Sequence, residues 1–344
     1  MAKSKVLVSG GFGYVGSRLV PFLLEKGYEI AVLDLCLYGT SGYTALHNDA
    51  RWSQWKQRFT FVEGDIRDPE AVSKSLHGCQ AVIHLAAISN DPTGEIDEIL
   101  TRQVNFDAVG LLLVKAKEAG VKRFINASSS SVFGLKKEEQ ISESLEPEPL
   151  TSYSKYKMLA EWLVFAAHSQ EFCTVNIRPA TICGYSPRQR FDLTVNKLTA
   201  DAVRKNLITV HGGQQRRPNV GMTDMINLYG ELLEVASEKI NGQTFNFGFE
   251  NHKIIDIAAI IKEQIGTSVS IKVTETFDQR DYHISSEKIA KILGYKPKSS
   301  ISKEVESLRC ALATNFSDSD AAEHYNMKCM NLRRNATAYH FLGC

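Results

Sequence analysis

The chain has 344 residues, more than one typical domain, and its 43% hydrophobic content is enough to bury a sizeable core. Its 40 basic and 39 acidic residues give a formal net charge of +1, which offers no electrostatic case for binding nucleic acid or an acidic membrane surface. No stretch approaches the roughly 18 apolar residues of a membrane span. Residues 1–5 lead into a strand without a signal peptide, so we expect a cytoplasmic protein. The 7 cysteines are scattered without a CxxC pair, which predicts neither a disulfide framework nor a metal site.

A glycine-rich loop follows the first predicted strand. Residues 5–9 form a short apolar run typical of a buried strand, and residues 10–16 (GGFGYVG) lead from it into an apolar-periodic helix that ends at Gly27. Gly10 would permit a tight turn, Gly13 the close approach of a pyrophosphate, and Gly16 the packing of helix on strand, while the helix N-terminus offers free amide donors. The alternative is an ordinary tight turn.

Asp34 stands at the end of the next predicted strand, residues 29–33. A carboxylate at this place in a dinucleotide-binding unit bonds the adenosine ribose hydroxyls, and it repels a 2′-phosphate. The sequence therefore favours NAD over NADP, with a helix cap or a solvated loop acid as the alternative for Asp34.

Strands and helices then alternate along the chain. Strands are predicted at residues 5–9, 29–33, 59–63, 81–85, 123–128 and 172–178, with helical patterns between them, the longest from about residue 96 to 119. This order predicts an α/β fold with a doubly wound parallel sheet of the Rossmann type. Ligands of such sheets bind at the carboxyl ends of the strands.

Tyr153 and Lys157 lie one helical turn apart in the segment TSYSKYK, residues 151–157. Residues four apart share a helix face, so the lysine charge can favour the phenolate and lower a pKa that is normally about 10. Such a phenol can take a proton from an alcohol whose carbon releases hydride to a nicotinamide. The pair alone also fits an exposed tyrosine beside a solvated lysine, and it gains weight from the motifs around it.

Over roughly residues 3–300 the chain resembles the extended short-chain dehydrogenase/reductase family, specifically its NAD-dependent nucleotide-sugar epimerases and dehydratases. The resemblance rests on residues 10–16, Asp34, residues 64–68 (GDIRD), 84–87 (HLAA), 127–134 (ASSSSVFG), Tyr153 with Lys157, and 178–184 (RPATICG).

The resemblance implies NAD as the cofactor and no metal. It implies cofactor contacts from Gly10, Gly13, Tyr14, Val15, Gly16, Asp34, Asp65, Ile66, Leu85, Ala86, Ala87, Tyr153, Lys157 and Pro179. It also implies a catalytic set of Tyr153 as base, Lys157 as its electrostatic partner and Ser129 as the hydroxyl that bonds the sugar oxygen. The neighbouring serines leave a one-residue shift open. Asn105 matches a helix asparagine with a supporting structural or proton-relay role.

The segment after Ser129 narrows the reaction. Sugar 4,6-dehydratases of the family carry an acid pair there, whereas Ser130 and Ser131 occupy those places in this chain. Dehydration is therefore not expected, and hydride chemistry at one carbon remains.

The resemblance divides the chain into an NAD-binding Rossmann domain at 1–178, with return segments near 222–250, and a mainly substrate-binding region at 179–344. Arg217 and Arg280 match the family's arginines that hold a nucleotide diphosphate, a task suited to a planar guanidinium. Asn196 is expected to meet the diphosphate or base through its side chain or backbone. Thr181, also expected at the substrate, replaces an asparagine common in sugar epimerases. The tail beyond about Ser317 matches nothing that we can assign.

The sequence thus predicts NAD-dependent oxidoreduction at a hydroxyl, most simply C4, of a nucleoside diphosphate sugar, with epimerisation through a ketone as the leading reaction. A net dehydrogenase or ketosugar reductase is the alternative enzyme, and an idle NAD-binding regulator is the alternative class. A homodimer is also expected, through the helix at 96–119 and the Tyr153 helix. Apolar side chains that could serve that contact are Leu111, Leu112, Val114, Trp162 and Phe165. The alternative for each of them is packing against the subunit's own sheet.

Overall fold

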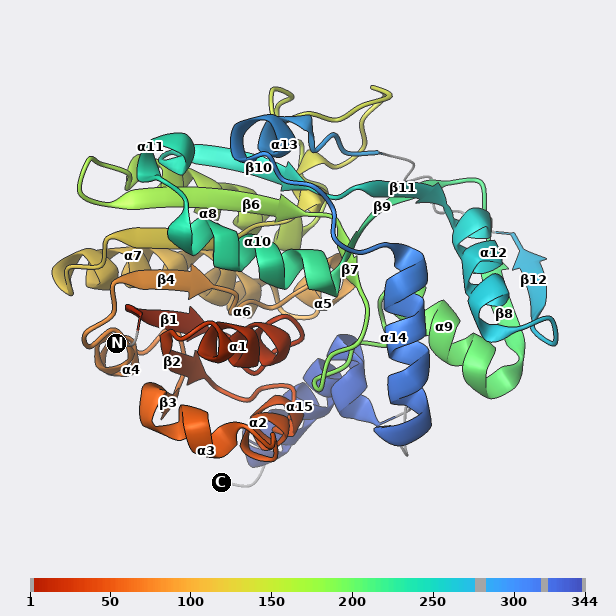
Figure 1. The fold of residues 1–344 in the computed structure, drawn as a ribbon, viewed down its shortest axis with the longest axis horizontal. Coiled ribbons are helices and arrows are strands. Elements are labelled where there is room, and N and C mark those ends of the chain that lie inside the picture. The colour runs from red at the N-terminus through yellow and green to blue at the C-terminus, as the bar shows by residue number, and fades with distance from the viewer. Residues whose placement is uncertain (1–2, 276–282, 317–320, 342–344) are drawn as a thin grey trace.

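The computed structural model describes residues 3–275, 283–316 and 321–341. Its centre is a parallel sheet of seven strands in the order β10-β6-β5-β4-β1-β2-β3 (Figure 1). The strands are β1 (Lys5–Ser9), β2 (Glu29–Asp34), β3 (Phe59–Glu63), β4 (Ala81–His84), β5 (Arg123–Ala127), β6 (Cys173–Pro179) and β10 (Gln243–Phe247). The predicted doubly wound parallel sheet is therefore confirmed, with a seventh strand that the sequence did not reveal.

Both faces of this sheet are covered by helices, which explains why the strands are apolar without alternation. Val6 and Val8 face a core shared with α1 (Gly16–Glu25) and α10 (Met222–Glu234). Leu7 faces the opposite core, which contains α4 (Pro69–Ser75), α7 (Ala108–Glu118) and α8 (Ser152–Ala166). Successive side chains of a strand point to opposite faces, so each apolar residue of β1 serves one of two cores.

The long helix predicted between residues 96 and 119 is interrupted. The chain forms α6 (Glu98–Arg102), a π-helical turn η2 (Gln103–Asp107) and then α7. A π turn inserts one extra residue into a helix and often marks a functional position. Here it carries Asn105, which is 1% exposed.

The apolar side chains expected at a subunit contact divide into two groups. Val114, Trp162 and Phe165 are 55%, 58% and 54% exposed on α7 and α8. Leu112 is 0% exposed and lies in the core beneath α7, with Leu111 partly buried against the same core. Leu112 therefore follows the alternative, because this side chain packs against the protein's own sheet and offers no interface surface.

A second region follows β6. It contains a sheet of β7 (Thr181–Cys183), β9 (Arg216–Gly221) and β11 (Glu250–Lys253), and a parallel pair of β8 (Leu207–His211) and β12 (Ser270–Thr274). The helices α9 (Thr194–Lys205), α12 (Ile254–Ile265) and α14 (Ile301–Thr314) surround these strands (Figure 1). Between β9 and β11 the chain returns to the main sheet, where α10 covers one face and β10 pairs with β6.

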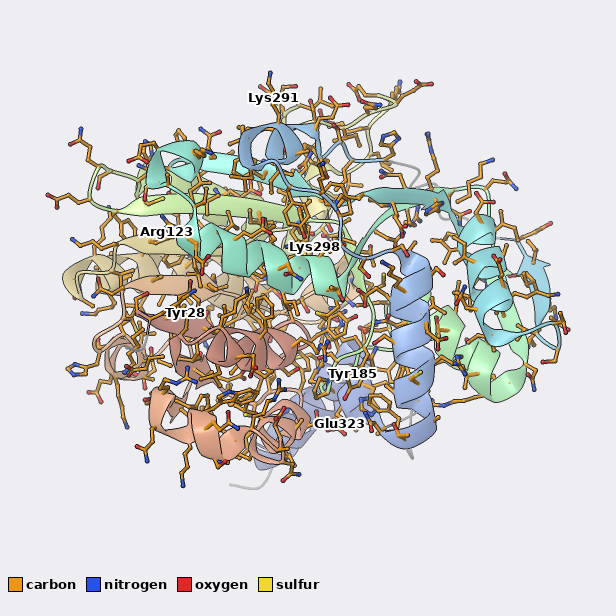
Figure 2. The ribbon with its side chains drawn as sticks, in the orientation of Figure 1. Tyr28, Arg123, Tyr185, Lys291, Lys298 and Glu323 are labelled. Carbon is orange, nitrogen blue, oxygen red and sulfur yellow. The ribbon has the colours of Figure 1, made fainter. Side chains whose placement is uncertain are left out.

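Arg123 fastens this return segment to the sheet. Its guanidinium donates to the carbonyl oxygens of Leu232 at 2.6 Å and Val235 at 2.8 Å, at the end of α10. The side chain reaches α10 from β5 (Figure 2).

Short elements complete the chain. They are α2 (Ser41–His47), α3 (Trp52–Trp55), η1 (Lys56–Arg58), α5 (Asp91–Gly94), η3 (Ser130–Phe133), α11 (Ser237–Ile240) and α13 (Glu287–Leu293). At the C-terminus, η4 (Ala322–His324) and α15 (Asn326–Phe341) lie beside the loop that precedes α2 (Figure 1). Within the described ranges, none of the helices has the length and apolar character needed to cross a membrane.

Candidate active site

A cavity of about 530 Å³ opens at the carboxyl ends of the central strands. Its lining includes Gly10, Gly13, Tyr14, Val15, Gly16, Asp34, Asp65, Ile66, Leu85, Ala86, Ala87, Ser129, Tyr153, Lys157, Pro179, Thr181 and Arg217. Residues spread over more than 200 positions of the chain thus meet around one space, as expected for a ligand at the carboxyl edge of an open α/β sheet.

The glycine-rich loop packs too tightly for side chains at two of its positions. Gly10 has φ +73°, and a Cβ atom there would lie 2.7 Å from the amide nitrogen of Ala86. A Cβ at Gly16 would overlap the backbone of Gly10 and Gly11. No side chain caps the N-terminus of α1, and its N-cap residue Val15 and first residue Gly16 both line the cavity. Such a helix end binds a diphosphate.

Asp34 is held at the end of β2 by two backbone amides. Its Oδ2 accepts a hydrogen bond from Phe12 N at 2.8 Å and its Oδ1 accepts one from Cys36 N at 2.8 Å. Burial raises the pKa of the carboxyl above its ordinary value, and these amides oppose the rise. The fixed carboxylate lies at the cavity wall and has lone pairs left to accept hydrogen bonds from ribose hydroxyls. The residues present therefore fit NAD.

The first turn of α8 is fixed by several hydrogen bonds. Thr151 and Ser154 form a capping box, the Thr151 hydroxyl donates to Asp91 at 2.6 Å, and Ser152 N donates to Glu95 at 2.6 Å. Gly94 packs against the backbone and Cβ of Tyr153, where a Cβ on the glycine would approach to 2.8 Å. This packing sets the position from which Tyr153, 8% exposed, meets the cavity.

Lys157 is 4% exposed, and its ammonium donates to Ala127 O at 2.7 Å. Burial lowers the lysine pKa to about 8, while the negative charge of Glu161 acts in the opposite direction. The ammonium is therefore a buried positive charge one helical turn from the Tyr153 backbone, as the spacing predicts.

The serine cluster separates into two roles. Ser128 donates to Glu161, which also receives two hydrogen bonds from Arg178, at 2.9 Å from Nε and 2.6 Å from Nη2. Ser129 Oγ instead lies 2.9 Å from Ser131 Oγ and accepts from Ser131 N at 3.1 Å, at the start of η3. The Ser128 hydroxyl serves a buried ion pair, whereas the Ser129 and Ser131 hydroxyls bond each other at the cavity wall.

Asn105 supports the wall of the cavity. Its side-chain amide donates to Ile88 O and accepts from Ile88 N, both at 2.9 Å. The π turn thus places Asn105 where it satisfies the backbone of a cavity-lining residue.

The predicted substrate residues are only partly brought together. Thr181 and Arg217 line the cavity. The Asn196 side chain does not, since it is 0% exposed and bonds Gly184 N at 2.9 Å, the Tyr14 hydroxyl at 2.9 Å and Arg190 O at 3.0 Å. A direct side-chain contact from Asn196 to a ligand is therefore not what the structure presents. Arg280 lies outside the described residues.

Several polar residues of the cavity were not expected from the sequence, among them Arg188, Arg190 and Asn326. Arg188 and Arg190 come from the loop between β7 and α9, and Asn326 comes from the first turn of α15. Arg190 is paired with Asp192 through two hydrogen bonds of 2.9 Å. The RQR spacing of residues 188–190 was a usable signal for cations in this loop, whereas no pattern in the tail points to Asn326.

Comparison with known proteins agrees with this site. The chain is 25% identical over 303 residues to an uncharacterized UDP-glucose epimerase, YtcB, of Bacillus subtilis (strain 168), covering 86% of this chain and 94% of that protein. It is 29% identical over 312 residues to the dTDP-D-glucose 4,6-dehydratase of Mus musculus, covering 86% and 84%. The crystal structure of UDP-glucuronic acid 4-epimerase from Bacillus cereus in complex with NAD superimposes with a TM-score of 0.78 at 27% identity, over 93% of this chain and 100% of that chain.

A family model matches a continuous block that covers more than half of the chain. The model of the NAD dependent epimerase/dehydratase family matches residues 6–248, from the first strand to the end of β10. This chain is an NAD-dependent enzyme of the epimerase/dehydratase family, to which it belongs through its sheet, its glycine-rich loop and its cavity.

Proposed function

We propose that this enzyme epimerises a hydroxyl-bearing carbon, most simply C4, of a nucleoside diphosphate sugar through a ketone. The observation that carries the proposal is a single cavity in which the Tyr153–Lys157 pair and Ser129 share walls with the glycine-rich loop and Asp34. A proton acceptor and a dinucleotide site that meet in one space suit the removal of a proton and a hydride from one alcohol.

Each catalytic side chain has a role that its surroundings support. Ser129 donates to the sugar oxygen, and Tyr153 takes the proton of that hydroxyl as a phenolate. The Lys157 ammonium favours the phenolate and, through its remaining donors, holds the nicotinamide ribose. NAD, when bound, accepts hydride from the sugar carbon and returns it. After the ketone turns its other face, Tyr153 returns the proton and the inverted alcohol leaves.

The substrate's diphosphate lies toward Arg217 in this proposal. The guanidinium comes from β9, is 9% exposed and lines the cavity, and arginine meets phosphate oxygens with a planar fork. The relatives act on or bind UDP-glucuronic acid, UDP-glucose and dTDP-glucose, which sets the first substrates to test.

Epimerisation is favoured over net oxidation because the relatives that match most of this chain include a UDP-glucose epimerase and a UDP-glucuronic acid 4-epimerase. An epimerase keeps its cofactor bound between the two hydride transfers, whereas a net dehydrogenase releases reduced cofactor in every turnover.

A substrate deuterated at C4 tests the reaction. Protein loaded with NAD is incubated with C4-deuterated UDP-glucose, UDP-glucuronic acid or dTDP-glucose, and the products are resolved by NMR. Epimerisation returns the deuterium to C4 of the inverted sugar, and Ser129→Ala should slow it by roughly 10²- to 10³-fold, the scale of one preorganised donor. Deuterium found instead in released reduced cofactor would identify a net oxidoreductase, and no turnover of any such sugar would favour an NAD-binding regulator.

The proposed assembly is a cytoplasmic homodimer formed through α7 and α8. Support comes from Val114, Trp162 and Phe165, which expose apolar surface on these neighbouring helices. We also assign residues 1–178, with the return segment 222–250, to cofactor binding and most of 179–344 to the substrate. The division follows from the strands that each part supplies.

A further inference from the structure

Arg188 is a buried cation whose hydrogen bonds are incomplete. It is 2% exposed and lines the cavity, and its Nη2 donates to Asn326 Oδ1 at 2.6 Å. Its guanidinium lies over the Tyr38 ring at 4.5 Å. Among the described residues, Arg188 Nε has no acceptor, and no carboxylate lies within ion-pair distance of its guanidinium. A buried arginine in this state lacks an anion.

A second polar atom in the same place also lacks a partner. The Tyr38 hydroxyl is buried at the cavity wall and has no hydrogen bond among the described residues. Burial raises the tyrosine pKa to about 12, so the hydroxyl remains a donor at neutral pH. The Tyr38 hydroxyl and Arg188 Nε belong to stacked side chains. Both are buried hydrogen-bond donors without an acceptor among the described residues.

The loop that carries Arg188 is fastened to the first turn of α1. Ser186 Oγ donates to Tyr14 O at 2.6 Å and lies 2.9 Å from Ser17 Oγ. The Tyr14 hydroxyl donates in turn to Gly184 O at 2.8 Å. Arg188 also acts on Asp34, whose pKa it lowers against the effect of burial. Arg188 thus acts on the ribose carboxylate, and its loop is bonded to the first turn of α1. A dinucleotide's diphosphate runs between these two elements.

The C-terminal segment holds this arrangement from outside. Asn326 donates to Ser89 O and Oγ while it accepts from Arg188, and Cys329 Sγ donates to Leu37 O at 3.4 Å. Glu323, labelled in Figure 2, packs against Gly39 in the same loop. Segments from both ends of the chain thus meet over one end of the cavity.

We propose that Arg188 binds the diphosphate of NAD together with the glycine-rich loop, and that Asn326 of the C-terminal segment fixes the guanidinium there. The inference rests on the proposed placement of NAD in the cavity. It makes the C-terminal segment around Asn326 part of the cofactor site, with Arg188 as a ligand and Asn326 as a positioning residue.

Calorimetry on the full-length protein, freed of nucleotide, tests the arginine. Arg188→Gln should weaken the binding of both NAD and ADP-ribose by about 10- to 100-fold, the range for a charge-assisted hydrogen bond. Binding of adenosine, which lacks the diphosphate, should be unchanged when it is measured by competition. Arg309→Gln removes the same charge from an exposed side chain of α14 and should leave every affinity as it was.

The positioning role of Asn326 needs a separate measurement. Asn326→Ala should weaken NAD by several-fold, and the double variant Arg188→Gln/Asn326→Ala should bind no more weakly than Arg188→Gln alone, because the asparagine acts through the arginine. Asn315→Ala is the matched control, since its side-chain amide also holds a neighbouring group, the Tyr185 hydroxyl at 3.1 Å.

The outcomes are distinct. Unchanged NAD affinity in folded Arg188→Gln overturns the inference, as does a loss confined to NADP, which would place the arginine at a 2′-phosphate. A loss confined to UDP would overturn it in favour of a substrate subsite. Additive effects in the double variant would remove the positioning role of Asn326. A parent protein that binds no NAD would instead refute the proposed function.

Discussion

Replacement of Glu161 should affect stability and catalysis through two different buried cations. Its carboxylate is 3% exposed, receives both Arg178 hydrogen bonds and the Ser128 hydroxyl, and lies one turn beyond Lys157 on α8. Glu161→Gln keeps the shape of the side chain and removes its charge. It therefore acts on two buried cations at once.

The stability effect follows from Arg178. This guanidinium is 6% exposed, and Glu161 is its single anionic partner among the described residues. Loss of one member of a buried pair costs about 3–5 kcal/mol, because the other charge remains buried and uncompensated. For a chain of 344 residues that corresponds to a fall of roughly 4–7 °C in the melting temperature.

The catalytic effect follows from Lys157. Burial already holds the pKa of its ammonium at about 8, and the Glu161 charge keeps it from falling further. Without that charge the pKa drops, so the amine loses its proton at a lower pH. The descending limb of the turnover profile should then move toward acid, with activity partly recovered at lower pH.

The assay is a melting curve and a pH profile of turnover for Glu161→Gln beside Glu306→Gln. Glu306 forms the same two-bond pair with Arg309, at 2.8 and 2.7 Å, but on the exposed surface of α14. The surface variant should change neither measurement. Equal melting temperatures for the two variants, or a pH profile of Glu161→Gln that matches the parent, would refute this reasoning.

Three further predictions concern cofactor choice, mechanism and assembly. Asp34→Ala should narrow a large preference for NAD over NADP, measured by calorimetry, and equal affinities in the parent would contradict the role given to Asp34. Tyr153→Phe should abolish hydride transfer yet keep NAD binding, whereas Lys157→Ala should damage both; substantial single-turnover activity in Tyr153→Phe would remove the phenol from the mechanism. Trp162→Glu should convert a dimer to a monomer in light scattering, while Val273→Glu, at an equally exposed apolar site on β12, should not; a monomeric parent protein would end the dimer proposal.

The sequence was informative where local chemistry determines structure. The strands at residues 5–9 and 59–63 have the predicted bounds. A short apolar run bounded by turn residues is typical of a buried strand. The glycine-rich loop, Asp34 and the Tyr153 pair lie on the cavity as expected. Each is a short motif whose function depends on its own few residues.

The sequence was less informative where distant contacts decide. The role of Asn196 depends on a Tyr14 hydroxyl 182 positions away, and that of Asn326 on Ser89, 237 positions away. The sequence of β10 shows no pattern that predicts a strand, and β10 takes its place in the sheet by pairing with β6. Tertiary contacts of this kind leave no periodic trace in the segments that make them.

The pairing of β10 with β6 has a consequence for how the chain folds and how it can be divided. Residues 180–242, which build part of the second region, are synthesised between the two strands. Until residue 247 has emerged, β6 is an edge strand with unpaired amides and carbonyls, a surface that invites association with other chains. A fragment ending near residue 178 would keep that edge permanently, so we expect the nucleotide-binding half expressed alone to associate with other chains. Because β10 is synthesised late, its pairing with β6 couples the folding of both halves of the chain to a single step.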